Sequence, residues 1–392
     1  MAGLRCGVPF PAACLRKFDF HSLNGNIQES DDPMAKRPLF PALPASAQRL
    51  FRRPLSVARF SRRWCGALSL TACAAVLLQV LLMAPGAKAQ EPIPSGADTS
   101  ATTRPLKSPG DHLHFLEFDG LRRSCLIHIP PKLDLSKPVP LVLVLHGAAM
   151  NAAMMAGFSG MNAEADVSGF IAVYPNGTGL QELLLVWNSG GVGPVRRRPD
   201  DVGFIRTLLD ELIPELNIDP RRVFATGMSN GGMMSYRLAA ELPDKIAAIA
   251  PVGGTLAIPD PQPQRPVPLI HFHGTDDGIV PWAGPSKGVA QRHEFQSVPD
   301  TIATWLRLTG AKEKPVIEEI PDRFDDGTSV RVHTHPAGKS GAEVVLVEII
   351  GGGHTWPGRQ PAFAFIGRST REISANRMIW DFFKKHPMPS DP

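Results

Sequence analysis

The feature that most constrains this chain is a Gly-x-Ser-x-Gly sequence at Gly227–Gly231, with Ser229 at its centre. A short apolar run, Val223–Thr226, precedes it, and good helix formers in Gly232–Ala240 follow it. The pattern predicts a strand, a sharp turn and a helix, with the serine raised on the turn. Glycines fit two positions before and after the serine, because a Cβ there would collide with the neighbouring strand or helix. A chain with 36 glycines can contain such a sequence by chance, so its surroundings must decide its meaning.

An export leader accounts for much of the N-terminal quarter. Five arginines between Phe51 and Arg63 precede an apolar run, Trp64–Met83, and an Ala-Lys-Ala sequence ends at Ala89. This order is typical of a secretory signal peptide. We therefore expect residues 1–89 to form a leader that is cleaved after Ala89, and a mature protein that is secreted, either extracellular or periplasmic. The alternative is an uncleaved anchor, since about 20 apolar residues suffice to span a bilayer.

Removing the leader reverses the sign of the net charge. The chain has 41 basic and 37 acidic residues, of which the leader holds 12 and 4. The mature chain keeps 29 basic and 33 acidic residues, a formal net charge of −4. Because no basic patch with interleaved aromatic residues is present, we expect no nucleic-acid binding and no stable membrane association after cleavage. Cys125 is the one cysteine of five beyond the leader, so we expect no internal disulfide.

The rest of the chain divides into a linker and one large domain. Residues 90–109 are rich in Pro, Ser and Thr without apolar periodicity, which predicts a disordered linker. Beyond it, short apolar runs such as Leu141–Leu145, Ile171–Tyr174 and Val344–Ile350 alternate with helical patterns. Such alternation predicts an α/β fold with a mostly parallel central sheet and helices on both faces. We place this domain at residues 110–388.

Two further segments carry clear local signals. His114–Ile129 alternates around Asp119–Gly120, which predicts one or two antiparallel edge strands. Apolar residues at spacings of three and four in Val202–Ile213 predict a helix, which Asp200 or Asp201 would cap.

Two later loops offer the groups that would activate a serine. A serine hydroxyl is a weak nucleophile at neutral pH and needs a base beside it and a carboxylate that orients the base. Asp277 follows one apolar run, and His354 follows three glycines after another. The chain order Ser229, Asp277, His354 is that of the α/β-hydrolase fold, and both loops would lie at the edge where parallel sheets carry their sites. Spacing alone does not choose between Asp276 and Asp277.

Two pairs of histidines raise the question of a metal site. His271 and His273 lie two apart on a predicted strand, so their side chains share a face, and His333 and His335 do the same. Because no third ligand lies at suitable spacing, we favour core or turn positions for all four. We expect neither a metal nor an organic cofactor.

Six motifs resemble those of a known family. They are Leu145–Gly147, Tyr174–Thr178, Asp200–Phe204, Ala225–Met234, His273–Trp282 and Gly351–Gly358. Together they resemble the exported polyhydroxybutyrate depolymerase and feruloyl esterase family of α/β-hydrolases, and the resemblance extends over about residues 110–386.

The resemblance implies a secreted serine carboxylic-ester hydrolase that forms an acyl-enzyme. Ser229 would be the nucleophile, Asp277 the acid and His354 the base. The backbone amides of Asn230 and Ala148 would form the oxyanion hole, the second uncertain by one position. The substrate would be an ester, either a hydroxyalkanoate oligomer or a hydroxycinnamoyl ester.

Three tryptophans lie in or beside motif loops, namely Trp187, Trp282 and Trp356. We expect them to line the substrate pocket, where they would favour a flat or aromatic acyl group, although a core position for at least one is the alternative. The chain departs from the family at Ser189, where several relatives have cysteine, and at Trp282, where tyrosine is frequent. It ends at Pro392 without the polymer-binding domain of depolymerases that attack solid polymer, so an insoluble substrate is not expected.

Two other functional classes fit parts of the pattern. An oligopeptidase-like serine hydrolase shares the order of the three residues but usually carries a propeller domain, for which this chain is too short. A non-catalytic binding protein on the same fold would be expected to have lost at least one of the three residue types, and all three are present.

Overall fold

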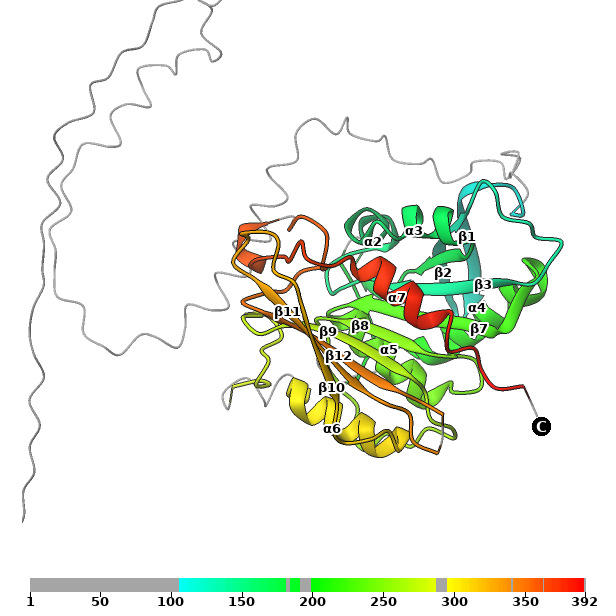
Figure 1. Cartoon of the computed structure of the whole chain (residues 1–392). Helices are drawn as coiled ribbons and strands as arrows, with labels where there is room; N and C mark the ends of the chain where they lie inside the picture. Colours follow the sequence, from blue (N-terminus) through cyan, green and yellow to red (C-terminus); the bar gives the residue numbers. More distant parts are fainter. Residues whose placement is uncertain are drawn as a thin grey trace, which may run out of the picture. The chain divides into compact units, whose positions relative to one another are not determined.

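A ten-stranded sheet forms the centre of the domain, as Figure 1 shows. This computed structural model describes residues 106–180, 184–190, 199–286, 295–339, 341–361 and 363–390. The strands of the sheet are β1 (Gly110–Phe118), β2 (Leu121–Ile129), β3 (Val139–Leu145), β4 (Ile171–Pro175), β7 (Ile218–Met228), β8 (Ile249–Val252), β9 (Leu269–Gly274), β10 (Val316–Ile320), β11 (Ser329–His335) and β12 (Val344–Ile350). A separate hairpin pairs β5 (Thr178–Leu180) with β6 (Leu184–Val186).

The strand order confirms the predicted α/β class. Along the sheet the order is β1-β2-β4-β3-β7-β8-β9-β12-β11-β10. The central strands from β4 to β12 pair in parallel, and the strands at both edges pair antiparallel. The buried apolar runs of the sequence therefore form the parallel centre, where both faces are covered.

Helices cover both faces of the sheet. They are α2 (Ala152–Ser159), α3 (Met161–Ser168), α4 (Asp201–Glu215), α5 (Asn230–Glu241), α6 (Val298–Thr309), α7 (Ala375–Phe383) and the short 3-10 helix η2 (Ala364–Ile366). One core contains side chains of α2, α3 and α7, and α7 crosses in front of the strands in Figure 1. The other core contains side chains of α4, α5 and α6. Two packed layers thus fix the strand ends on which the site is built.

Local signals explain two elements at the start of the domain. β1 and β2 form the predicted antiparallel edge pair, joined by Asp119 and Gly120, whose positive φ angles of 50° and 71° suit a two-residue hairpin turn. Asp200 is the N-cap of α4, because its side chain accepts a hydrogen bond from the amide of Gly203. Cys125 is buried in β2 as a free thiol.

The predicted leader, residues 1–89, and residues 90–105 of the predicted linker lie outside the described residues. Within the described part of the chain, no helix is both long enough and apolar enough to cross a membrane.

Four parallel strands end at one edge of the sheet and lead into the loops of interest. The loop after β3 carries Ala148, and the turn after β7 is Ser229 itself. The loops after β9 and β12 carry Asp277 and His354. Because β7, β8, β9 and β12 are successive neighbours, these groups gather at one end of the sheet.

Candidate active site

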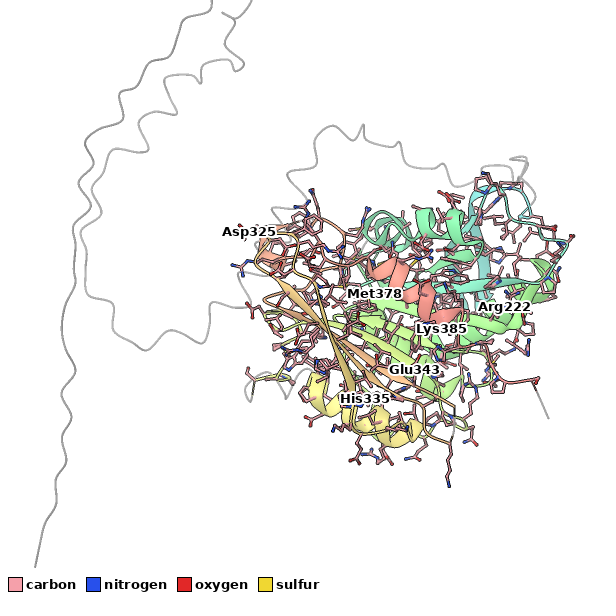
Figure 2. The ribbon with its side chains drawn as sticks, in the orientation of Figure 1. Arg222, Asp325, His335, Glu343, Met378 and Lys385 are labelled. Atoms are coloured by element: carbon pink, nitrogen blue, oxygen red, sulfur yellow. The ribbon has the colours of Figure 1, made fainter. Side chains whose placement is uncertain are left out.

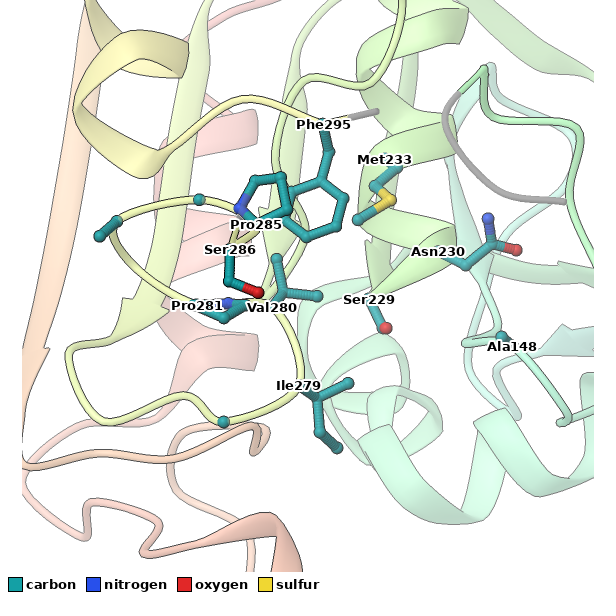
Figure 3. A pocket seen from close by; sticks show the side chains of 13 residues that line it. Ala148, Ser229, Asn230, Met233, Ile279, Val280, Pro281, Pro285, Ser286 and Phe295 are labelled. Carbon is teal, nitrogen blue, oxygen red and sulfur yellow. The ribbon is translucent and has the colours of Figure 1, made fainter. Parts of the chain in front are cut away.

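Ser229 lies on the sharp turn that the sequence predicts between β7 and α5. Its backbone has φ 56° and ψ −120°, which for a residue other than glycine costs roughly 1–3 kcal/mol. The surroundings hold it there, because the Ser229 amide donates to the Val252 carbonyl at 2.9 Å and its carbonyl accepts from the Met233 amide. The strain raises the side chain above the sheet edge, and Figure 3 shows it facing a cavity.

The glycines around Ser229 are required by close packing. A Cβ built on Gly227 would lie 2.6 Å from the Gly231 carbonyl oxygen. One built on Gly231 would lie 2.6 Å from the His146 carbonyl oxygen and closer still to that of Leu145. Real Cβ atoms do not approach backbone so closely, so larger residues would push α5 away from β3 and β7.

Asp277 and His354 are hydrogen-bonded to each other. The distance from His354 Nδ1 to Asp277 Oδ2 is 2.7 Å, and both side chains are buried. The other oxygen, Oδ1, accepts from the amides of Ile279 and Val280, each at 2.8 Å. Asp276, by contrast, is exposed, and its carboxylate accepts a long hydrogen bond of 3.4 Å from Thr275 Oγ1. The structure therefore pairs Asp277 and not Asp276 with His354.

Two opposing effects set the pKa of Asp277. Burial raises it, but the hydrogen bond from His354 and the charge interactions with His354 and His273 outweigh burial and hold the pKa below its usual value. Asp277 is therefore ionised at neutral pH. An ionised carboxylate can only accept a hydrogen bond, so His354 Nδ1 carries a hydrogen and donates it to Asp277, which leaves the Nε2 lone pair for another partner.

The end of β8 brings His354 next to the turn of Ser229. Val252, the last residue of β8, accepts the Ser229 amide, and a Cβ on the next residue, Gly253, would lie 3.2 Å from His354 Nδ1. A Cβ on Gly254 would collide with the Ser229 carbonyl oxygen. Ser229 and His354 thus lie against the same glycine pair.

Two backbone amides lie beside Ser229. Ala148 and Asn230 line the same cavity as Ser229, and Asn230 is the first residue of α5. Among the described residues, neither amide has a hydrogen-bond acceptor, whereas the amide of Ala149 donates to Leu185 O at 2.8 Å. The Ala149 amide is therefore occupied, and Ala148 as the second oxyanion donor stays a prediction. A helix N-terminus also favours negative charge.

A buried polar layer supports both amides. His146 Nε2 accepts from the Gly177 amide at 2.9 Å, so its Nδ1 carries the hydrogen, 2.8 Å from Gly147 O. Burial lowers the pKa of His146 to about 4, so the ring is neutral. The Asn230 side chain points away from Ser229 in Figure 3, and it accepts from the Trp187 amide at 2.7 Å.

The three predicted pocket tryptophans do not line the cavity. Trp187 is 1% exposed, its ring lies tilted against that of His146, and its Nε1 donates to His146 O. Trp356 is also 1% exposed, and its Nε1 donates to Asn376 Oδ1 at 2.7 Å. Trp282 is half-buried, and its ring and that of His273 form a T-shaped pair with centroids 6.0 Å apart. Indole N–H groups that find partners in the core fix two of these rings beneath the loops.

Other residues form the cavity wall, and the sequence reading missed them. The cavity has a volume of about 720 Å³. Beside Ser229, Asn230 and Ala148, its lining is Met233, Gly278, Ile279, Val280, Pro281, Ala283, Gly284, Pro285, Ser286 and Phe295. Most of this wall is the segment directly after Asp277, and that adjacency was the available signal. Nothing in the sequence marked Phe295.

A buried ion pair was also missed. Arg123 Nη2 lies 2.8 Å from Asp201 Oδ1, and both side chains are at most 3% exposed. Asp201 Oδ2 accepts the Asn188 amide at 2.7 Å, which anchors the segment that ends β6 and carries Trp187. The Asp200–Phe204 motif thus supplies a cap in Asp200 and an anchor in Asp201.

His271 and His273 contact each other in the core. His271 Nε2 lies 3.1 Å from His273 Nδ1. Among the described residues, no group of three or more His, Cys, Asp or Glu side chains is arranged to hold a metal ion.

Comparison with known proteins gives concordant matches. The family model described as Esterase PHB depolymerase matches residues 123–257. Putative esterase NocK of Nocardia uniformis subsp. tsuyamanensis is 35% identical over 67% of this chain and 79% of its own length. Feruloyl esterase B of Piromyces equi is 28% identical over 68% of this chain and 46% of its own length. Poly(3-hydroxyalkanoate) depolymerase C of Paucimonas lemoignei is 32% identical over 32% of this chain and 30% of its own length.

The chain thus spans less than half of two of these relatives and most of the third. The sheet order, with the strained serine turn after β7, is that of the α/β-hydrolase fold. The family-model match and the extent of the match to NocK show that the chain belongs to the esterase family of PHB depolymerases, a family of carboxylic ester hydrolases.

Proposed function

We propose that this protein is an exported serine carboxylic-ester hydrolase that works through an acyl-enzyme on Ser229. The observation that carries the proposal is the 2.7 Å hydrogen bond between Asp277 and His354, beside the strained turn of Ser229. A base that is oriented by a carboxylate is what a serine hydroxyl requires to become a nucleophile.

The first half of the reaction transfers the acyl group to the enzyme. His354 Nε2 takes the hydroxyl proton as Ser229 Oγ attacks the ester carbonyl carbon, and the carbonyl electron pair moves onto its oxygen. The amides of Asn230 and Ala148 donate to this oxyanion. Asp277 stabilises the imidazolium without taking its proton. When the carbonyl re-forms, the alcohol leaves with the proton from His354.

The second half returns the enzyme to its starting state. A water molecule gives a proton to His354 Nε2 and attacks the acyl carbon. The second oxyanion collapses, the carboxylic acid leaves, and Ser229 Oγ recovers its proton from His354. Every step uses only protons and electron pairs, so the chain needs no cofactor for this chemistry.

The cavity supports an uncharged acyl group. None of the described residues that line it carries a charged side chain, and Met233, Ile279 and Phe295 give it an apolar wall. Such a wall favours an apolar or aromatic group, because burial gains roughly 25 cal/mol per Å² of apolar surface. The names of two relatives supply the candidates, a hydroxycinnamoyl ester and a hydroxyalkanoate oligomer.

A substrate panel tests the proposal. The wild-type protein is expected to hydrolyse a short nitrophenyl ester and at least one of methyl ferulate and a hydroxybutyrate oligomer. Ser229→Ala should abolish this activity, whereas Ser286→Ala, at a serine of the same cavity wall, should keep it. Cleavage of peptides instead of esters would favour the oligopeptidase-like alternative. Binding without turnover would favour a binding protein.

We also propose that residues 1–89 are a cleaved leader, that residues 90–109 are a linker and that residues 110–388 form the catalytic domain. The proposal rests on the basic, apolar and small-residue order of the leader. N-terminal sequencing of the exported protein is expected to find Gln90 first. An intact leader, or a mature protein that begins at another residue, would contradict it.

A further inference from the structure

Two buried histidines of β9 are joined to the loop that carries Asp277. His271 and His273 are 0% and 1% exposed, and their rings stack at 5.2 Å with an interplanar angle of 8°. His273 Nε2 lies 2.8 Å from the Val280 carbonyl oxygen and 3.5 Å from Asp277 Oδ2. On the other side, the Tyr236 hydroxyl lies 2.9 Å from His271 Nδ1. We call Tyr236, His271 and His273 the histidine chain.

The hydrogen bonds of the histidine chain have one direction. A carbonyl oxygen only accepts, so His273 Nε2 must carry a hydrogen and donate it to Val280 O. Burial lowers the pKa of both His271 and His273, so both rings are neutral and His273 Nδ1 is an acceptor. His271 Nε2 therefore donates to it, and His271 Nδ1 accepts from the Tyr236 hydroxyl. All four ring nitrogens are paired, and each ring has one tautomer.

The histidine chain connects the two parts of the proposed machinery through the core. Tyr236 belongs to α5, the helix that begins directly after Ser229. At the other end, Val280 O accepts from His273 while the Val280 amide donates to Asp277 Oδ1 at 2.8 Å. Val280, whose amide holds one oxygen of Asp277, is itself held at its carbonyl by His273.

We propose that His273 is a positioning residue for ester hydrolysis, which fixes Asp277 against His354 by holding the Val280 carbonyl and facing Asp277 Oδ2. In this arrangement His271 and Tyr236 hold His273 in the tautomer that donates. The inference rests on the proposed function of Ser229, Asp277 and His354. Filling the core does not by itself explain these two histidines, because apolar side chains would fill it without the desolvation penalty of an imidazole.

Three substitutions separate positioning from packing. His273→Leu removes both ring nitrogens at similar volume, whereas His273→Gln keeps a donor near the position of Nε2. Tyr236→Phe removes one oxygen atom from a buried side chain that is not among those lining the cavity. It keeps the test available if His273→Leu does not fold.

The chain offers a matched control at His335. This imidazole is 7% exposed and donates from Nδ1 to a backbone carbonyl, Lys312 O, at 3.0 Å. His335 pairs with Val344 at the start of β12, whereas His354 follows the end of that strand, about 20 Å away by strand length. Figure 2 shows His335 at the opposite end of β11 from Asp325. His335→Leu thus measures the loss of a buried imidazole without touching Asp277.

The readouts are kcat, KM, the pH profile and one proton resonance. His273→Leu should lower kcat by about 10- to 100-fold with KM within about twofold, since a small misplacement of catalytic groups has effects of this size. The kcat/KM of His273→Leu should also stay constant down to a lower pH, because a displaced carboxylate stabilises the imidazolium less. The titratable groups that face Asp277 are His273 and His354. The downfield resonance of the His354 Nδ1 proton should weaken. His273→Gln should recover kcat to within about fivefold, and Tyr236→Phe should lower it by about two- to tenfold.

Each outcome has one reading. If His273→Leu keeps the kcat, pH profile and downfield resonance of His335→Leu and loses only stability, the histidine chain is packing and the inference fails. Unchanged kcat in folded Tyr236→Phe contradicts the part assigned to Tyr236. If the wild-type protein hydrolyses no ester at all, the proposed function fails instead.

Discussion

Asp277 is the residue on which the geometry of the site depends most. It accepts two backbone amides at one oxygen and His354 at the other, and His273 lies 3.5 Å away. Its neighbour Asp276 is exposed, with its amide tied to the Gly352 carbonyl. The two adjacent carboxylates therefore lie in different surroundings, because Asp277 faces the imidazole and Asp276 faces solvent.

Amide substitutions separate the two carboxylates. Asp277→Asn keeps the shape and removes the charge, so we expect kcat to fall by about 10⁴, by analogy with the serine-protease triad. Asp276→Asn should change kcat by about tenfold or less, through loop geometry alone. Steady-state kinetics at equal folded content checks both. A larger loss for Asp276→Asn would mean that the acid is the neighbour.

The contact of α5 with the ends of β3 and β7 sets the position of Ser229. Gly231→Ala places a Cβ against the carbonyls of Leu145 and His146, so we expect unfolding to become easier by about 1–3 kcal/mol, with a loss of kcat as α5 shifts. Gly157→Ala in α2 is the control, because a Cβ there meets nothing within 4 Å. It should leave activity intact and stabilise by up to about 1 kcal/mol. Urea denaturation measures the stability of both variants, and steady-state kinetics measures their kcat. Equal effects at the two glycines would show that close packing at Gly231 does not set the position of Ser229.

Some elements could be predicted from sequence and others could not, for physical reasons. β3 and β12 are continuous apolar runs because both of their faces are buried. β12 has the predicted bounds, and β3 begins two residues before the predicted Leu141. β10 was missed because this edge strand is exposed on nearly every residue, which leaves no alternation. α6 was missed although Ser297 caps it, because it is rich in β-branched residues that also suit strands.

The site shows the same division. The pairing of Asp277 with His354 agrees with the predicted chain order, since each follows a strand of the same parallel set. The pocket wall could not be predicted from residue type, because Trp187 and Trp356 are large enough to serve either as wall or as core. Hydrogen bonds to His146 O and Asn376 place these two in the core, and only tertiary structure shows such partners.

At the scale of the whole molecule, buried neutral histidines make stability depend on pH. Burial lowers the pKa of His146 to about 4 and also lowers those of His271 and His273. An unfolded histidine titrates near pH 6.5, so below that pH the unfolded chain binds protons that the folded chain does not. The stabilisation is therefore complete above about pH 6.5 and is lost as the pH falls toward 4.

We expect the free energy of unfolding to fall by about 2 kcal/mol between pH 7.5 and pH 5 from His146 alone, and further with His271 and His273. Urea titrations at the two pH values measure the change. Added salt should leave it largely intact, because desolvation and not surface charge is its main cause. Constant or rising stability toward pH 5 would contradict the assignment of these rings as buried and neutral.

Mass spectrometry after reaction with a fluorophosphonate tests most directly whether Ser229 is the nucleophile. This reagent phosphonylates activated serines. We expect one adduct per chain, on the peptide that contains Ser229, with none in Ser229→Ala and much slower labelling in His354→Ala. Ser286→Ala should be labelled like the wild type, since Ser286 lines the cavity wall and is not the serine that His354 activates. An unlabelled wild-type protein, or an adduct on any other serine, would show that Ser229 is not the nucleophile.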